Sequence, residues 1–90
     1  MYTVLEHRRV SKQMIKAPIG VRKAYHAWKR IVELEGPKGL RLIQGFRDEA
    51  LKGEWKGFRS SRLTLKWRVI YKIEKEELAV YVVEVNPHEY

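Results

Sequence analysis

The spacing of the apolar residues changes partway along the chain, from a period of about 3.6 residues to a period of 2. Between Val21 and Val32, six apolar side chains fall at positions i, i+3, i+4, i+7, i+10 and i+11, which is typical of an amphipathic helix. Between Trp67 and Ile73, every second residue is a large apolar one, as in a strand with one buried face. A helix and a sheet with one apolar side each must bury those sides together, so the pattern predicts helices packed on a sheet.

The limits of the long helix can also be read from the sequence. Pro18 suits the first turn because a proline has no N–H to leave unpaired there, and Gly36-Pro37 ends the helix. Weaker patterns predict the other elements of the N-terminal part. They are a strand over residues 2–7, a helix over residues 8–17, one or two helical turns over residues 38–46, and a loop over residues 47–53.

The strand pattern that begins at Trp67 extends backwards through Leu65 and Leu63. It fits either one long strand or a hairpin that turns near Leu65-Lys66, and the period alone allows both. The charged run "EKEE" that follows predicts a turn. After it, "LAVYVVEV" (residues 78–85) is almost continuously apolar, which predicts an interior strand covered on both faces.

The predicted order of elements is strand, helix, helix, strand, strand, strand. We therefore expect an α+β fold, with two N-terminal helices on one face of a mostly antiparallel four-stranded sheet and the other face left open. A chain of 90 residues can supply only one core, so a single domain over residues 1–90 is expected.

The positive charge is large and unevenly distributed. The net charge is +8, and residues 1–45 carry ten lysines and arginines against three acids. Between Lys52 and Lys72 there are seven cations and one acid, Glu54. Such a basic field attracts polyanions, so the sequence favours a nucleic-acid partner. A solvated basic surface, or one complementary to an acidic protein, is the alternative.

Several classes of protein do not fit this sequence. No apolar run reaches the roughly 18 residues of a membrane span, and the N-terminus lacks the order of a signal peptide, so a cytoplasmic protein without a membrane partner is expected. With no cysteine and with histidines only at positions 7, 26 and 88, no metal site is expected. "GPKGLRLIQG" lacks the ending of a phosphate-binding loop, and we expect no cofactor.

The remaining polar residues suit the cleavage of a phosphodiester bond in RNA. Glu49 stands beside the basic segment, cations alternate along the strands, and the C-terminus offers His88, Glu89 and Tyr90. Cleavage through the 2′-hydroxyl of RNA needs a base for its proton, a cation for the charged phosphorane and an acid for the leaving 5′-oxygen. For Glu49, a merely solvated carboxylate is the alternative, and for Arg68 it is a surface pair with Glu84 or with a glutamate of the turn.

Two segments resemble a known family. "DEALKGEWKGFRSSRLTLKWRVIYKI" (residues 48–73) is similar to the Leu-Lys-Gly, aromatic-Arg and Arg-(Val/Leu)-(Ile/Val)-Tyr signature of the RelE/ParE toxin superfamily. "VNPHEY" (residues 85–90) looks like the His-Tyr ending of its YoeB-like and HigB-like branches. The resemblance covers the chain in element order, is strongest over residues 48–90, and implies a RelE-like fold with a hairpin near Leu65-Lys66.

The resemblance also implies roles for individual residues. It makes Glu49 the candidate general base and Arg68 the residue that stabilises the transition-state phosphate. His88 and Tyr90 match the family's ending, although Glu89 stands between them, so which residue acts as the acid stays open. The expected contacts to RNA phosphates are five cations: Lys52, Lys56, Arg59, Arg62 and Lys66.

The function implied by the resemblance is that of a toxin in a type II toxin-antitoxin system. Such a toxin is a ribosome-dependent endoribonuclease (mRNA interferase) that cuts mRNA in the ribosomal A site, and its partners are a cognate antitoxin and the 70S ribosome with mRNA. Two other functions stay open. One is a ParE-like inhibitor of DNA gyrase, and the other is an RNA-binding module without catalysis.

Overall fold

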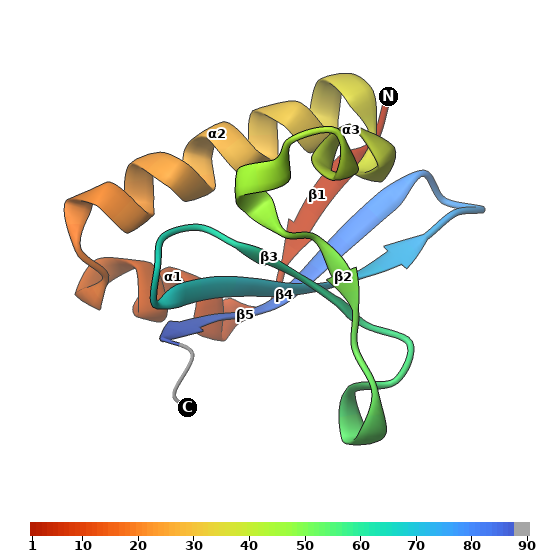
Figure 1. Ribbon diagram of the computed structural model, residues 1–90. Coiled ribbons are helices and arrows are strands. Elements are labelled where there is room, and N and C mark those ends of the chain that lie inside the picture. Colours follow the sequence, from red (N-terminus) through yellow and green to blue (C-terminus); the bar gives the residue numbers. More distant parts are fainter. Residues whose placement is uncertain (88–90) are drawn as a thin grey trace.

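The computed structural model describes residues 1–87 and shows helices packed on a twisted sheet (Figure 1). The order of elements along the chain is β1 (Thr3–Glu6), α1 (Arg8–Lys16), α2 (Ile19–Glu35), α3 (Pro37–Arg41), the 3-10 turn η1 (Gln44–Phe46), β2 (Glu49–Ala50), the 3-10 turn η2 (Gly53–Trp55), β3 (Arg59–Arg62), β4 (Trp67–Glu74) and β5 (Ala79–Pro87). The predicted α+β class is confirmed.

The sheet differs from the prediction in strand number and direction. It has five strands in the order β1-β5-β4-β3-β2, and β1 runs parallel to β5 while the other neighbours are antiparallel. The prediction of four strands is wrong because β2 has only two residues, too few to show alternation. The mixed direction was missed because a period of 2 says nothing about which way a strand runs.

The number of helices was also underestimated. α3 is a third α-helix, with Pro37 at its first position. Gly36 separates α2 from α3 with a φ of 76°, a left-handed conformation that glycine adopts without strain. A Cβ atom at Gly36 would also lie only 3.0 Å from Cε1 of Tyr2. The Gly-Pro pair therefore ends one helix and starts the next.

The predicted hairpin and interior strand are confirmed. β3 and β4 pair antiparallel around a turn over residues 63–66, so the apolar alternation there belongs to two strands. β5 lies between β1 and β4 in the sheet. Its almost continuous run of apolar residues follows from this central place, since both its faces are partly covered.

α1 follows β1, and residues at its start and middle form hydrogen bonds with the backbone of β5. His7 donates its backbone N–H to the Val82 carbonyl (2.8 Å), and its Nδ1 accepts from the Arg9 N–H at the start of α1 (3.1 Å). Further along, the Gln13 side chain accepts a hydrogen bond from the backbone N–H of Val85 (2.7 Å). α1 therefore satisfies a β5 donor that β1 is too short to reach.

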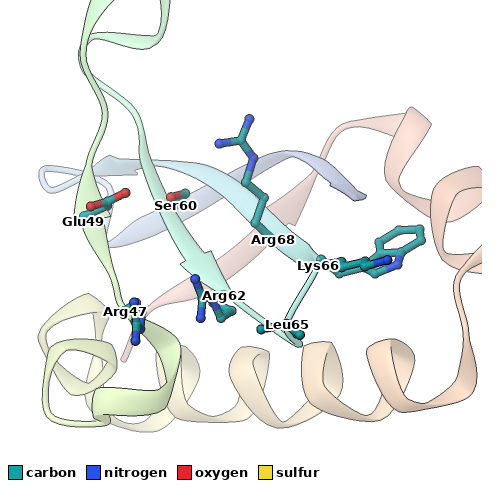
Figure 2. A pocket seen from close by; sticks show the side chains of 8 residues that line it. Arg47, Glu49, Ser60, Arg62, Leu65, Lys66 and Arg68 are labelled. Carbon is teal, nitrogen blue, oxygen red and sulfur yellow. The ribbon is translucent and has the colours of Figure 1, made fainter. Parts of the chain in front are cut away.

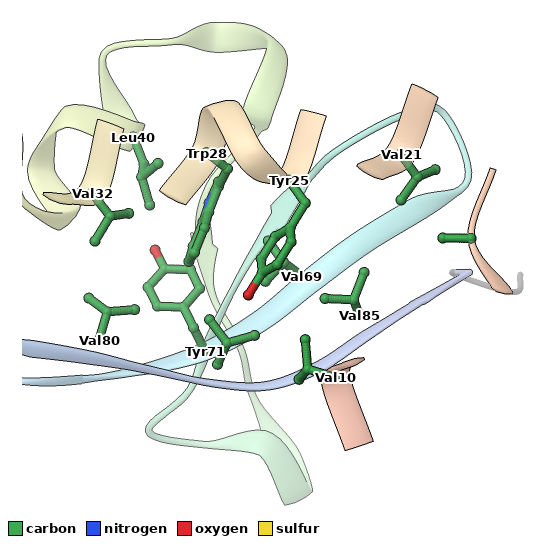
Figure 3. Close-up of a cluster of buried hydrophobic side chains, with 12 residues drawn as sticks. Val10, Val21, Tyr25, Trp28, Val32, Leu40, Val69, Tyr71, Val80 and Val85 are labelled. Atoms are coloured by element: carbon green, nitrogen blue, oxygen red, sulfur yellow. The ribbon is translucent and has the colours of Figure 1, made fainter. Parts of the chain in front are cut away.

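The core lies between α2 and the central strands (Figure 3). α2 contributes a stripe of four buried residues, Val21, Tyr25, Trp28 and Val32. The Trp28 ring stands edge-on to the ring of Tyr71 on β4, with 5.2 Å between centroids, a favourable geometry for two aromatic rings. Among residues 1–87, no helix is both long enough and apolar enough to span a membrane.

Candidate active site

The two faces of β3 carry different side chains. Arg59 and Ser61 lie opposite Tyr71 and Val69 of β4, which belong to the core below α2. Ser61 also accepts a hydrogen bond from Nε1 of Trp28 (3.0 Å). Because successive side chains of a strand point to opposite faces, Ser60 and Arg62 face the side of the sheet that α2 leaves uncovered.

A pocket of about 170 Å³ lies on this uncovered face (Figure 2). Its lining comes from the segment between η1 and β2, from β2 itself, from β3, and from the β3–β4 turn with the start of β4. The lining residues are Arg47, Glu49, Ser60, Arg62, Leu65, Lys66, Trp67 and Arg68. The pocket therefore gathers four cations around a single carboxylate.

Strand register places these groups next to one another. Glu49 is the Cα partner of Ser60, and Arg62 is the Cα partner of Arg68. Residues directly opposite one another lie on the same face of a sheet, so both arginines belong to the pocket face. Like charges in such a pair are destabilising, and an anion bound between them would remove that repulsion.

Arg68 has no partner for one of its buried donors within the part of the chain that the structure describes. Its Nε atom is buried and forms no hydrogen bond there. Figure 2 shows its side chain projecting from β4, away from α2. Glu84, the alternative partner considered for Arg68, instead accepts from Nη1 of Arg9 (3.4 Å) and from the Asn86 amide. Among residues 1–87, neither Glu84 nor another acid forms an ion pair with Arg68.

The other predicted RNA contacts are divided between the pocket and its surroundings. Arg62 and Lys66 line the pocket. Lys52 and Lys56 lie outside it, exposed on either side of η2 in the β2–β3 connection, which projects beyond the sheet in Figure 1. An N–H···O bond from Leu51 to Phe58 (2.9 Å) closes this connection at its base.

Arg59 lies on the opposite face of β3 from the pocket and is bound to Asp48. Its Nη2 and Nε atoms lie 2.7 and 2.8 Å from Oδ1 of Asp48, whose side chain is 0% exposed. Oδ2 of Asp48 accepts from the hydroxyl of Ser61 (2.6 Å) and from that of Tyr71. We call Asp48, Arg59, Ser61, Tyr71 and Trp28 the Asp48 network.

The Asp48 network shifts the titration of two of its members. Burial, together with the hydrogen bond to the Asp48 carboxylate, raises the pKa of the Tyr71 hydroxyl above its ordinary range. Burial lowers the pKa of Arg59, but the hydrogen bonds and charge of Asp48 outweigh it, and the net pKa shift is upward. Both effects keep Tyr71 neutral and Arg59 charged.

Two of the site residues near the pocket were not predicted from the sequence. Arg47 lines the pocket and has a left-handed backbone, with a φ of 43°, and Asp48 begins the network. Nothing in the spacing of either residue distinguishes it from a loop residue. Their only sequence signal was their place next to Glu49.

The predicted residues His88 and Tyr90 lie outside the described residues. The last described residue, Pro87 at the end of β5, is the Cα partner of Trp67, which lines the pocket. Within residues 1–87, no three histidine or acidic side chains are grouped as metal ligands would be. The ionisable groups that line the pocket are therefore four cations and one carboxylate.

Comparison with known proteins supports the fold assignment. No protein-family model matches the sequence, and no curated protein matches it either. Solved structures do match. A chain of the RelE-RelB complex from the archaeon Pyrococcus horikoshii is 23% identical, with a TM-score of 0.75 over 96% of this chain and 93% of that one.

Two further matches are more distant in sequence and similar in shape. The YoeB/ParE toxin from Agrobacterium tumefaciens is 14% identical, with a TM-score of 0.75 over 97% of this chain and 99% of that one. A chain of the YoeB-YefM complex from Staphylococcus aureus is 13% identical, with a TM-score of 0.72 over 100% of this chain and 99% of that one. The chain therefore shares the fold of these RelE and YoeB structures.

Proposed function

We propose that this protein is the toxin of a type II toxin-antitoxin system and acts as a ribosome-dependent endoribonuclease. Its substrate would be mRNA in the ribosomal A site, and cleavage would stop translation in the cytoplasm. The observation that carries the proposal is the pocket in which Glu49 lies among Arg47, Arg62, Lys66 and Arg68. An acid-base residue inside a cluster of cations is what cleavage of a phosphodiester requires.

The reaction would use the RNA's own nucleophile. Glu49 takes the proton from the 2′-hydroxyl, and the resulting oxygen attacks phosphorus while the bond to the 5′-oxygen breaks. A proton from an acid then completes the leaving 5′-hydroxyl, and the other product is a 2′,3′-cyclic phosphate. Arg68, whose Nε lacks a partner within residues 1–87, would hold the charge that builds on the phosphoryl oxygens.

The acid is assigned to the C-terminal tail. His88 follows Pro87 directly in sequence, and Pro87 pairs with Trp67 next to Arg68. Histidine can release a proton near neutral pH, so His88 is the proposed donor, with Tyr90 as an additional contact to the substrate. Four cations surround the single carboxylate of the pocket, and a carboxylate among cations is a weak base. Positioning of the mRNA by the ribosome would therefore supply much of the rate.

The other proposed partner is a cognate antitoxin. The solved structures from Pyrococcus horikoshii and Staphylococcus aureus are toxin complexes, RelE-RelB and YoeB-YefM. With a net charge of +8, this chain would favour an antitoxin segment rich in acidic residues. We expect such a segment to protect the cell by covering basic surface that the mRNA needs.

Primer extension on mRNA in a translation reaction tests the proposal. We expect discrete cuts with the unmodified protein and a loss of about 100-fold or more in cleavage rate for Arg68→Ala and for Glu49→Gln, because each removes a group that acts in the transition state. His88→Ala should reduce the rate by a similar factor. Naked RNA should be cut slowly or not at all.

The matched control is Lys72→Ala. Lys72 is a cation of the same strand as Arg68, but it pairs with Glu74 (3.4 Å) and does not line the pocket. Its variant should cut mRNA at the normal rate. If the protein arrests DNA supercoiling by gyrase and leaves mRNA intact, it is a gyrase inhibitor and not a nuclease. If Arg68→Ala weakens RNA binding and no RNA is cut, the chain is a binding module.

A further inference from the structure

The strand that carries Glu49 has little to hold it in place by itself. Within residues 1–87, β2 consists of Glu49 and Ala50, lies at the edge of the sheet, and pairs with β3 alone. A two-residue ladder at an edge supplies few hydrogen bonds, and edge segments with few contacts open most easily. Some other contact must fix the direction in which Glu49 enters the pocket.

The residue before β2 provides such a contact. The Asp48 carboxylate is fully buried and accepts from three side chains on the core face, those of Arg59, Ser61 and Tyr71. Ser61 is held in turn by Nε1 of Trp28 in α2. Through these bonds one carboxylate ties the start of β2 to β3, to β4 and to the long helix.

The geometry connects this anchor to the pocket. Asp48 and Glu49 are consecutive, and Asp48 reaches the core face while Glu49 lines the pocket on the other face. β3 repeats the arrangement, since Arg59 and Ser61 bind Asp48 while Ser60 and Arg62 line the pocket. A bond formed on one face of these strands thus fixes side chains on the other face.

We propose that Asp48 is a positioning residue, which sets the place of Glu49 in the pocket through its bonds to Arg59, Ser61 and Tyr71. The inference rests on the proposed function, because it assigns Glu49 the catalytic role. Asp48 itself touches no substrate. It acts by fixing the position of the β2 backbone, because buried hydrogen bonds restrict its motion.

Asp48→Asn tests the proposal, since an amide of the same shape cannot accept bonds from all of these donors. We expect kcat for cleavage of ribosome-bound mRNA to fall at least about 10-fold while KM changes less than about 2-fold. In the double variant Asp48→Asn/Glu49→Gln, the loss should equal that of Glu49→Gln alone, since the two residues act as one unit. Additive losses would overturn the proposal.

A second measurement does not depend on catalysis. The Leu51 N–H donates to the Phe58 carbonyl (2.9 Å) directly after β2, and its hydrogen exchange reports the order of this strand. In Asp48→Asn this exchange should become at least about 10-fold faster. Unchanged exchange together with unchanged kcat would overturn the proposal, whereas faster exchange in a protein that cleaves no RNA would reject only the nuclease.

The matched control is Glu6→Gln. Glu6 also accepts from a tyrosine, Tyr25 (2.5 Å), and from a cation, Lys29 (3.5 Å), but it lies outside the pocket. The same exchange of a carboxylate for an amide should leave kcat and the Leu51 exchange unchanged there. If Asp48→Asn does not fold, Tyr71→Phe removes a single bond to Asp48, and it should produce the same changes on a smaller scale.

Discussion

Two parts of the molecule contain the same three groups, a tyrosine hydroxyl, a carboxylate and a cation. On the core face of β3 they are Tyr71, Asp48 and Arg59, and between α2 and the end of β1 they are Tyr25, Glu6 and Lys29. In the first set the carboxylate side chain is 0% exposed and the arginine side chain 22%. In the second set the carboxylate and lysine side chains are 36% and 31% exposed.

The difference lies in what replaces water. The carboxylate of Asp48 has lost its solvent and has two charged N–H donors within 2.8 Å, so each remaining bond matters to stability. Glu6 keeps contact with solvent, and Lys29 stands 3.5 Å away, a pair of the kind that contributes little. We therefore expect burial, and not the choice of residues, to decide which set stabilises the fold.

The largest expected effect on stability is that of Asp48→Ala. It leaves the partly buried charge of Arg59 and the hydroxyls of Ser61 and Tyr71 without their acceptor. Breaking a buried ion pair from one side is strongly destabilising, so the free energy of unfolding in urea should fall by about 3 kcal/mol. A loss below about 1 kcal/mol would mean that the two sets are equivalent.

The next largest effect should come from the two tyrosines. Tyr71→Phe removes a bond to a carboxylate that water cannot reach, and we expect a loss of about 2 kcal/mol. Tyr25→Phe leaves Glu6 with solvent as a substitute, and the loss should be about 1 kcal/mol. Urea titrations of both variants measure the difference, and equal losses would contradict the role given to burial.

Alkaline pH should reduce the contribution of both sets to the free energy of unfolding. Burial and the bonds to Glu6 and Asp48 raise the pKa values of Tyr25 and Tyr71, so the folded protein keeps both protons where unfolded tyrosines lose theirs. The contribution is fully present below the usual pKa of about 10 and is lost as the pH rises above it. The unfolding free energy should fall by about 1.4 kcal/mol per pH unit for each tyrosine.

The matching phenylalanine variants provide the control for this pH dependence. Each one removes a titrating hydroxyl, so the slope of the unfolding free energy between pH 10 and 11 should become shallower by about one proton. A slope that is the same in the wild type and in both variants would show that other groups, such as lysines, cause the alkaline loss.

The smallest effect is expected for Glu6→Gln. The pair between Glu6 and Lys29 borders a surface hollow of about 370 Å³ between α1 and α2, where solvent screens the charges. The change in unfolding free energy should stay below about 1 kcal/mol, and added salt should reduce it further. A larger loss that persists in high salt would place Glu6 with Asp48 as a structural residue.

The sequence was sufficient to predict the elements with many residues in a clear period. The stripe of α2 and the alternation of β4 each fix a long element, and the apolar run of β5 predicted its interior place. β2 was missed because two residues have no period. The parallel pairing of β1 with β5 was missed because it depends on contacts between distant parts of the chain.

The candidate site was predictable in part, for a related reason. Glu49 and the strand cations were candidates from the sequence itself, and the family resemblance implied the roles of Glu49 and Arg68. Their common pocket was visible only once strand register was known. Arg59 was expected to bind RNA, but the sequence of a strand does not show whether an acidic residue lies next to a cation on the same face. Asp48 is that acid, and its place there depends on partners from two other elements, β3 and β4.

The central place of β5 has a consequence for the order in which the molecule can be assembled during synthesis. Thr3 pairs with Ala79, so the ribosome must synthesise almost the whole chain after Thr3 before its partner exists. While the ribosome is still adding residues 79–87, β1 and β4 have no neighbour to join them. The sheet of the nascent chain therefore stays in two separate parts until β5 has emerged and pairs with both β1 and β4.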